Sequence, residues 1–201
     1  VVINDNGGLK GAKDFSFQVG TGTITPFTES TDFLHGENQI ILDAGTYSVS
    51  EPSVSGYSTS YNNCSSVIVP SGGSATCTVT NNDSAPSLTL IKKVINDSDG
   101  NSSASSWILS ASGPTPISGA GGVTSGSTFY QGVYTLSEST GPGGYTPSSW
   151  VCTGTGSQSG NTISLALGES ATCTITNDDI DVLPTIAVTK TAGVASVNEP
   201  S

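Results

Sequence analysis

Four cysteines are the chemically most distinctive side chains of this 201-residue sequence: Cys64, Cys77, Cys152 and Cys173. Zinc binding is one chemistry open to them, but the sequence has no Cys-x-x-Cys pair and a single histidine, His35. Oxidation to disulfides is the other, and it is what we expect. Disulfides persist in oxidising compartments, so they indicate an extracellular protein.

Carboxylates suggest a second chemistry, the binding of Ca²⁺. Residues 96–101 (NDSDGN) resemble the start of a calcium loop, but no Glu stands at the twelfth position, which excludes an EF-hand. A hairpin turn is the simpler interpretation of this stretch. We expect no cofactor, and keep as candidate Ca²⁺ ligands Asp97, Asp99, Asp178, Asp179 and Asp181.

Catalysis finds little support in these residues. The single histidine, His35, lies in a turn with Gly36 and Glu37. Neither a Ser-His-Asp arrangement nor a two-carboxylate glycosidase site can be argued from it. We therefore expect that the chain is not an enzyme.

An internal repeat organises the whole chain. Six blocks recur in the same order, among them Ala75-Thr76-Cys77-Thr78-Val79-Thr80-Asn81, which returns as Ala171-Thr172-Cys173-Thr174-Ile175-Thr176-Asn177. The offset between blocks varies, which is typical of loops that differ on a retained strand scaffold. The repeat predicts a first module over 1–83, a linker over 84–87, a second module over 88–180, and a linker with a further strand over 181–201.

Each module reads as a β-sandwich. Leu88, Leu90 and Lys92 fall on one face at a period of two, and Gly, Pro, Asn and Ser clusters separate such runs. The 25 glycines and 10 prolines agree with many short strands. We predict an all-β protein of two tandem Ig-like or prealbumin-like β-sandwich modules, followed by an extra C-terminal strand.

Charge excludes several classes of partner. The net charge is −11, from 16 acidic residues against 5 lysines. Nucleic acids require a basic surface, and anionic membranes attract one, so we expect neither as a partner. No apolar run is long enough to span a bilayer, which predicts no membrane insertion of this segment.

The repeat also selects the cysteine pairing. Four cysteines allow three pairings, and only Cys64 with Cys77 and Cys152 with Cys173 keeps one equivalent bond in each module. A bond between neighbouring strands would limit fraying where the chain leaves each module.

Short motifs in both copies resemble the prealbumin-like, collagen-adhesin B-type domains of microbial surface proteins and pili. In copy two these are Leu88-x-Leu90-x-Lys92, Tyr134-x-Leu136-x-Glu138, Gly144-Tyr145 and Thr174-x-Thr176-Asn177. Copy one matches through Tyr47-x-Val49-x-Glu51, Gly56-Tyr57 and Thr78-x-Thr80-Asn81.

The resemblance implies a self-formed isopeptide bond in copy two. Lys92 would be the nucleophile, Glu138 the proton shuttle and Asn177 the acceptor, since burial turns a lysine into a nucleophile. Lys92 shares the inward parity of Leu88 and Leu90, which favours it over Lys93. The alternative is that the Lys92 side chain snorkels to solvent and that Glu138 and Asn177 serve ordinary edge and turn roles.

Copy one departs from this pattern, because the position equivalent to Lys92 falls before Val1. One hypothesis is donor-strand exchange, in which the tail of one subunit completes copy one of the next. The other is that the sequence is a slice of a longer protein. The donor strand would comprise Thr185, Ile186, Ala187, Val188, Thr189, Lys190 and Thr191.

Together these features predict a structural subunit or segment of an extracellular stalk, fibre or pilus-like filament, at the cell surface or secreted. Its partners would be copies of itself or neighbouring modules of the same surface protein. The alternative is an adhesin or carbohydrate-binding surface module, for which Trp150 would be a stacking platform. Packing of Trp150 against the nearby disulfide is the simpler interpretation.

Overall fold

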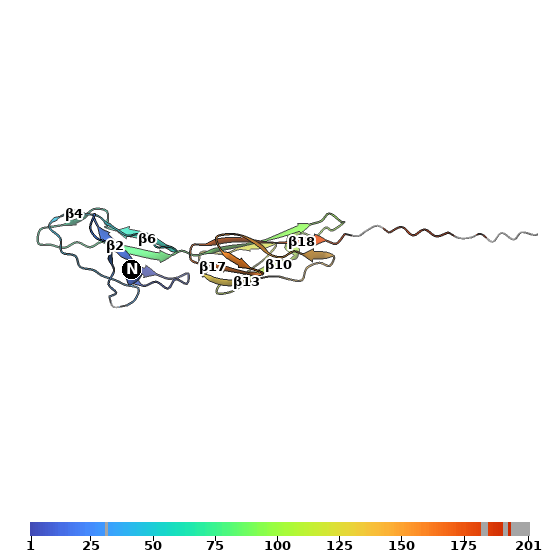
Figure 1. Cartoon of the computed structure of the whole chain (residues 1–201), viewed down its shortest axis with the longest axis horizontal. Coiled ribbons are helices and arrows are strands. Elements are labelled where there is room, and N and C mark those ends of the chain that lie inside the picture. The colour runs from blue at the N-terminus through green and yellow to red at the C-terminus, as the bar shows by residue number, and fades with distance from the viewer. Residues whose placement is uncertain (31, 182–184, 191–192, 194–201) are drawn as a thin grey trace, which may run out of the picture.

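The structure is a computed structural model that describes residues 1–30, 32–181, 185–190 and 193. Two all-β modules lie end to end, and the described part of the tail leads away from the second (Figure 1). Residues 185–190 of the predicted donor strand are exposed and form no strand, while Thr191 lies outside the described residues. The prediction of tandem β-sandwich modules is confirmed. Within the described ranges, no helix has the length and apolar character needed to cross a membrane.

Module two is a sandwich of two sheets. One sheet has the order β11-β10-β13-β17-β16 and the other β12-β9-β18-β14, with β15 also paired to β18. The elements are β9 (Ser87–Ile95), η2 (Ala104–Ser106), β10 (Ile108–Ser112), β11 (Ile117–Ala120), β12 (Gly122–Thr124), β13 (Gly132–Glu138), β14 (Tyr145–Pro147), β15 (Val151–Gly154), β16 (Ser157–Ser159), β17 (Thr162–Leu165) and β18 (Ser170–Asp179).

Module one repeats this plan with shorter strands. Its sheets are β1-β8-β6, β3-β2-β5 and β4-β7. The elements are β1 (Val2–Ile3), η1 (Ala12–Asp14), β2 (Ser16–Val19), β3 (Thr25–Pro26), β4 (Gly45–Tyr47), β5 (Val49–Ser50), β6 (Tyr57–Asn62), β7 (Val67–Val69) and β8 (Thr78–Asp83). Short strands bury less apolar surface, and Ile41 of module one is 97% exposed.

The first and last strands of module two form the centre of one sheet. β9 and β18 are parallel neighbours that pair over nine residues, from Ser87 with Ser170 to Ile95 with Asp178. Alternate residues of each strand point into the core, as the period of two predicts. On β9 the inward face carries Leu88, Leu90 and then Lys92, all buried. The apolar face therefore ends in a polar group that must find a partner inside the protein.

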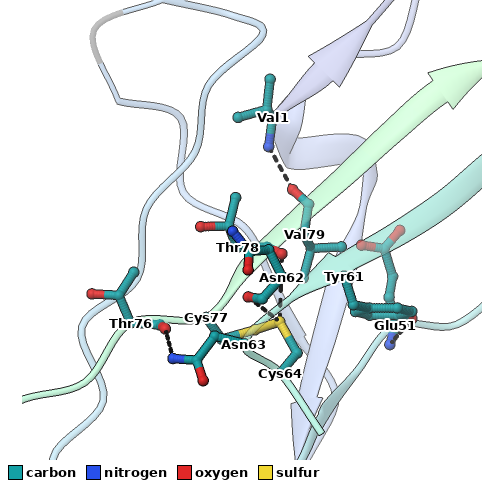
Figure 2. Close-up of a disulfide and its surroundings, with 10 residues drawn as sticks. All are labelled: Val1, Glu51, Tyr61, Asn62, Asn63, Cys64, Thr76, Cys77, Thr78 and Val79. Atoms are coloured by element: carbon teal, nitrogen blue, oxygen red, sulfur yellow. Dashed lines mark hydrogen bonds between the residues drawn. A yellow bond between two sulfur atoms is a disulfide. The ribbon is translucent and has the colours of Figure 1, made fainter.

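Both predicted disulfides are confirmed. Cys64 and Cys77 bond in module one, and Figure 2 shows Asn63 beside them donating its side-chain amide to Thr76 O at 2.7 Å. Cys152 and Cys173 bond in module two, where they are directly opposite residues of the antiparallel pair β15 and β18. The bond in module two ties the last strand, β18, to β15, and the bond in module one ties the residue just before the last strand, β8, to the segment after β6.

Replacing Cys152 and Cys173 by serine is expected to lower the free energy of unfolding by about 3 kcal/mol. The two residues are 21 positions apart, and the bond restricts the unfolded chain over that loop. Urea unfolding without reductant measures the change. The Cys64 and Cys77 pair, 13 positions apart, should cost slightly less when replaced in the same way. Equal stability of the oxidised and reduced wild-type chain would contradict this expectation.

The two modules touch directly at a short junction. β8 ends at Asp83 and β9 begins at Ser87, so only residues 84–86 connect them. Gly168 N of module two donates to Ser84 O at 2.8 Å. Across the junction, Asn6 Nδ2 donates to Ser127 O at 2.9 Å. These bonds join residues far apart in sequence and restrain the orientation of one module on the other.

Candidate functional site

Three polar side chains of module two meet inside the sandwich. Lys92 comes from β9 and Asn177 from the neighbouring β18, where Lys92 pairs with Ile175, two residues before Asn177. Glu138 ends β13 in the opposite sheet. Parity places all three side chains between the sheets, and the sandwich brings together residues that lie up to 85 positions apart, since 177 − 92 = 85.

Glu138 contacts both Lys92 and Asn177, and the three residues form a triad. Its Oε1 lies 2.7 Å from Lys92 Nζ and accepts a hydrogen bond from Asn177 Nδ2 at 2.9 Å. The Lys92 side chain is completely buried and that of Glu138 is 10% exposed. Among the described residues, Asn177 Oδ1 is buried without a hydrogen-bond partner. The contacts link the three residues predicted to form the isopeptide site, and Lys92 does not snorkel to solvent.

Trp107 completes the surroundings of Lys92. Its ring centroid lies 4.8 Å from Nζ, within the range of a cation–π contact. Trp107 is 2% exposed and packs edge-on against Tyr145, with ring centroids 5.2 Å apart. Trp107 is therefore a core residue, and nothing in its sequence spacing indicated that it would cover the amine.

Burial lowers the pKa of Lys92. Removal from water disfavours the charged ammonium, and the hydrogen bond and charge of Glu138 only partly oppose this effect. A lowered pKa increases the population of neutral amine, which is the nucleophilic form. The triad thus combines an activated amine, an adjacent carboxylate that can move a proton and a carboxamide in one buried cluster.

Module one keeps two members of the same arrangement. Asn81 Nδ2 donates to Glu51 Oε2 at 3.1 Å, and Thr59 Oγ1 donates to Asn81 Oδ1 at 2.8 Å. Burial raises the pKa of Glu51, against the hydrogen bond from Asn81 and the charge of the Val1 amino group. Figure 2 shows Val1 beside Val79, whose carbonyl oxygen accepts a hydrogen bond from the Val1 amino group at 2.8 Å. The carboxylate and carboxamide are therefore in place in both modules.

The candidate calcium ligands have another use in the structure. Asp97, Asp178 and Asp179 do lie together. However, the Asp179 carboxylate accepts hydrogen bonds from the main-chain N–H groups of Asp97, Ser98 and Gly100. Asp181 accepts the Ser98 hydroxyl. These bonds hold the loop after β9 in shape, and Asp99 does not join the cluster. The hairpin interpretation of this stretch was wrong, because β9 and the next strand, β10, lie in different sheets.

This carboxylate lock is a feature that the sequence interpretation missed. In module one, Asp83 accepts the main-chain N–H groups of Asp5, Asn6 and Gly8 in the same way. The available signal was the recurrence of an Asn-Asp pair after the first strand together with an Asp at the end of the last strand.

Replacing Asp97 by asparagine is expected to raise the melting temperature by a few degrees at pH 7. The pKa of Asp97 is raised by desolvation, by the charge of Asp178 and by its contacts with Asp179, so its ionised form is disfavoured in the folded state. That destabilisation is present above the folded pKa and disappears on acidification. The gain should therefore vanish near pH ~3, where the group is protonated in both states.

Thermal unfolding at the two pH values tests this expectation. Asp43→Asn, a remote change in module one, is the matched control and should leave the melting temperature unchanged at both. A gain at pH 7 that persists at low pH would contradict the electrostatic cause.

Trp150 does not form an exposed stacking platform. It is 9% exposed and belongs to the hydrophobic core cluster that includes Cys173. Its main-chain oxygen accepts the side-chain amide of Gln158 at 2.8 Å. The simpler interpretation of this residue, packing beside the disulfide, agrees with the structure.

A family model described as a prealbumin-like fold domain matches residues 1–79 and 83–175. The chain belongs to this family. The two matched segments follow the two modules, so the resemblance seen in the short sequence motifs is confirmed. A search of curated proteins gave no match.

Several solved structures share similarity with this prealbumin-like chain. The Bacillus anthracis TIE protein is 15% identical with a TM-score of 0.46, and the match covers 90% of this chain and 33% of that one. The major pilin from Streptococcus pyogenes is 15% identical with a TM-score of 0.37, over 89% of this chain and 95% of that one. The S. pyogenes major pilin T3.2 is 12% identical with a TM-score of 0.38, over 89% and 96%. The chain thus spans a third of the first of these proteins.

Proposed function

We propose that this chain is a load-bearing segment of an extracellular stalk, fibre or pilus-like filament. The observation that carries the proposal is the path of the chain through module two. It enters along β9 and leaves along the parallel neighbour β18, so a pull on the two ends shears nine paired residues at once. The end-to-end placement of the modules (Figure 1) puts the same load on both.

In the proposed mechanism, Lys92 and Asn177 join in an isopeptide bond. Glu138 accepts a proton from the Lys92 ammonium, and the neutral amine attacks Cγ of Asn177. A bond forms between Nζ and Cγ, while the bond between Cγ and Nδ2 breaks. Glu138 returns the proton to the leaving nitrogen, which departs as ammonia, and then takes the second proton from Nζ, which leaves the new amide neutral. The contacts of 2.7 and 2.9 Å support these proton transfers, because each lies within hydrogen-bond reach.

Such a bond would shorten the path of the load. Force entering at Ser87 would run along β9 to Lys92, cross to Asn177, and leave at the end of β18. Residues 93–176 would be bypassed, so module two could not be drawn out under tension. The disulfides agree with an extracellular setting, where the chain would associate with neighbouring modules.

A finer part of the proposal is assembly by donor-strand exchange. In module one, β1 pairs only with Asn81 and Asn82 of β8 among the described residues. The tail carries Ile186-x-Val188-x-Lys190, the same pattern as Leu88-x-Leu90-x-Lys92 in β9. The tail of one subunit would add to β8 of the next and give an open head-to-tail filament.

The size of the purified protein under native conditions and its appearance by electron microscopy test the assembly. The purified chain is expected to form filaments whose length grows with concentration, and Val188→Asp should prevent them by placing a charge on the inward face of the donor strand. Thr189→Asp, on the opposite face, is the matched control and should assemble normally. A chain that stays monomeric at high concentration would refute strand exchange, while leaving the stalk role to be judged by the isopeptide bond.

A further inference from the structure

We propose that the far end of module two is a docking surface for a further module of the same fold, seated as module two is seated on module one. The inference rests on the proposed stalk role and specifies its next contact. The partner is a prealbumin-like module that follows in the same polypeptide and would include residues 185–190 in its first strand, so this inference is the alternative to strand exchange by the tail. Its near end carries a glutamine loop and an apolar turn like those of module two.

The existing junction is built on a loop of module one that Asp83 holds in shape. Between the hydrogen-bonded residues of that loop, Gly7 adopts a φ of 92°. Gln131 of module two forms two hydrogen bonds with this loop. Its main-chain N–H donates to Asn6 O at 3.0 Å, and its side-chain amide donates to Gly7 O. A single glutamine thus recognises two consecutive main-chain oxygens.

A turn of module two closes the other half of the junction. Gly168 N donates to Ser84 O, and Ser84 N donates to Gly56 O at 2.9 Å. Leu167 covers Gly56 so closely that a Cβ added to this glycine would lie 2.7 Å from Leu167 Cβ. The junction therefore consists of an amide contact and an apolar contact.

The far end of module two repeats the recognised loop. Asp179 accepts the main-chain N–H groups of Asp97, Ser98 and Gly100 at 3.0, 2.9 and 2.6 Å. These three residues are the counterparts of Asp5, Asn6 and Gly8 in module one, each 92 positions later in the sequence. In the place of Gly7, Asp99 adopts a φ of 71°. The left-handed backbone is retained even though a non-glycine residue occupies it less readily.

The apolar half of the surface is repeated as well. Ile180 N donates to Gly144 O at 2.9 Å, as Ser84 does to Gly56, and the two glycines have φ values of 86° and 80°. Among the described residues, a Cβ at Gly144 would meet no heavy atom within 4 Å. Ile180 beside it is 54% exposed. The surface that Leu167 covers in the first junction is open in its counterpart.

The exposed groups define the chemistry of the partner. The oxygens of Ser98 and Asp99 correspond to the acceptors used by Gln131, and Ile180 O corresponds to the acceptor used by Gly168. Ser98 stands where Asn6 donates to Ser127, and its hydroxyl instead donates to Asp181. The second junction should therefore depend more heavily on the glutamine than the first does.

A chain with module two duplicated tests the inference. Residues 86–201 are appended after Asp181 of the intact preceding modules, so that Ile180 and Asp181 stay in place, and only the added copy is labelled with ¹⁵N. Amide hydrogen exchange of its Gln131 and Gly168 is expected to be about tenfold slower than in the same chain with about fifteen Gly and Ser residues inserted before the added copy. Gln131→Ala in the added copy should speed exchange at Gly168.

Equal exchange with and without the flexible insert would overturn the inference. Protection that survives the insert and rises with protein concentration would overturn it too, because the occupant would then be a second chain. The first junction serves as the internal reference, with its Gln131 labelled in the unaltered chain. If amide exchange of Gln131 is slowed at the first junction but not in the added copy, the docking surface alone is refuted. If exchange is slowed at neither junction, the stiff stalk is refuted as well.

Discussion

After full reduction, the intact mass of the chain is expected to be about 17 Da below the mass of its sequence, because one isopeptide bond releases one molecule of ammonia. The reason is the triad of module two, in which Lys92 and Asn177 both contact Glu138 at hydrogen-bond distances inside a pocket closed by Trp107. High-resolution mass spectrometry measures this difference directly, and reduction removes the contribution of the two disulfides.

Four variants locate the bond. Lys92→Ala and Asn177→Ala should each restore the full mass, while Asn81→Ala, the equivalent change in module one, should leave the loss in place. Glu138→Gln should also restore it, since the amide cannot relay the proton. A full-length wild-type mass, or a loss that survives Asn177→Ala, would show that the triad does not react.

Lys92→Ala should also weaken module two. It removes the covalent tie between the first and last strands and leaves the buried Glu138 carboxyl without the nitrogen that it contacts, so we expect the free energy of unfolding to fall by about 3–5 kcal/mol. Lys93→Ala is the matched control: it is the adjacent lysine, its side chain is exposed, and its stability should stay within about 0.5 kcal/mol of wild type.

Replacing Trp107 by alanine is the second change with a large expected effect. It should lower the free energy of unfolding by about 3–5 kcal/mol, because the side chain is 2% exposed and its removal leaves a cavity beside Lys92. Denaturant unfolding measures the loss, and the tryptophan fluorescence of Trp150 remains as a probe. Formation of the isopeptide bond should slow as well, since water would reach the amine.

Trp107→Phe is the control that the chain itself suggests. Module one has Phe15 at this position, 1% exposed and packed edge-on against Tyr57 at 5.2 Å, just as Trp107 packs against Tyr145. The phenylalanine should therefore recover more than half of the loss. Equal destabilisation by alanine and phenylalanine would mean that ring packing does not stabilise this site.

The sequence by itself determined the features that depend on local pattern. The repeat divided the chain into two modules, the period of two placed Leu88, Leu90 and Lys92 on one inward face, and the symmetry of the cysteines selected their pairing. These features follow from residue spacing within one strand or from comparison of the chain with itself, so they need no knowledge of distant contacts. The role of the triad came from the family resemblance rather than from spacing.

Only the tertiary structure decided which distant groups meet. Parity could point Lys92 inward, but the register of β9 against β18 and the facing of the two sheets brought it to Glu138 and Asn177. The same holds for Asp179, which the sequence offered as a calcium ligand and the fold uses to accept three main-chain N–H groups. Gln131 reaches the loop at Gly7 across 124 positions of sequence. Contacts of this kind depend on packing between elements, which a one-dimensional pattern does not encode.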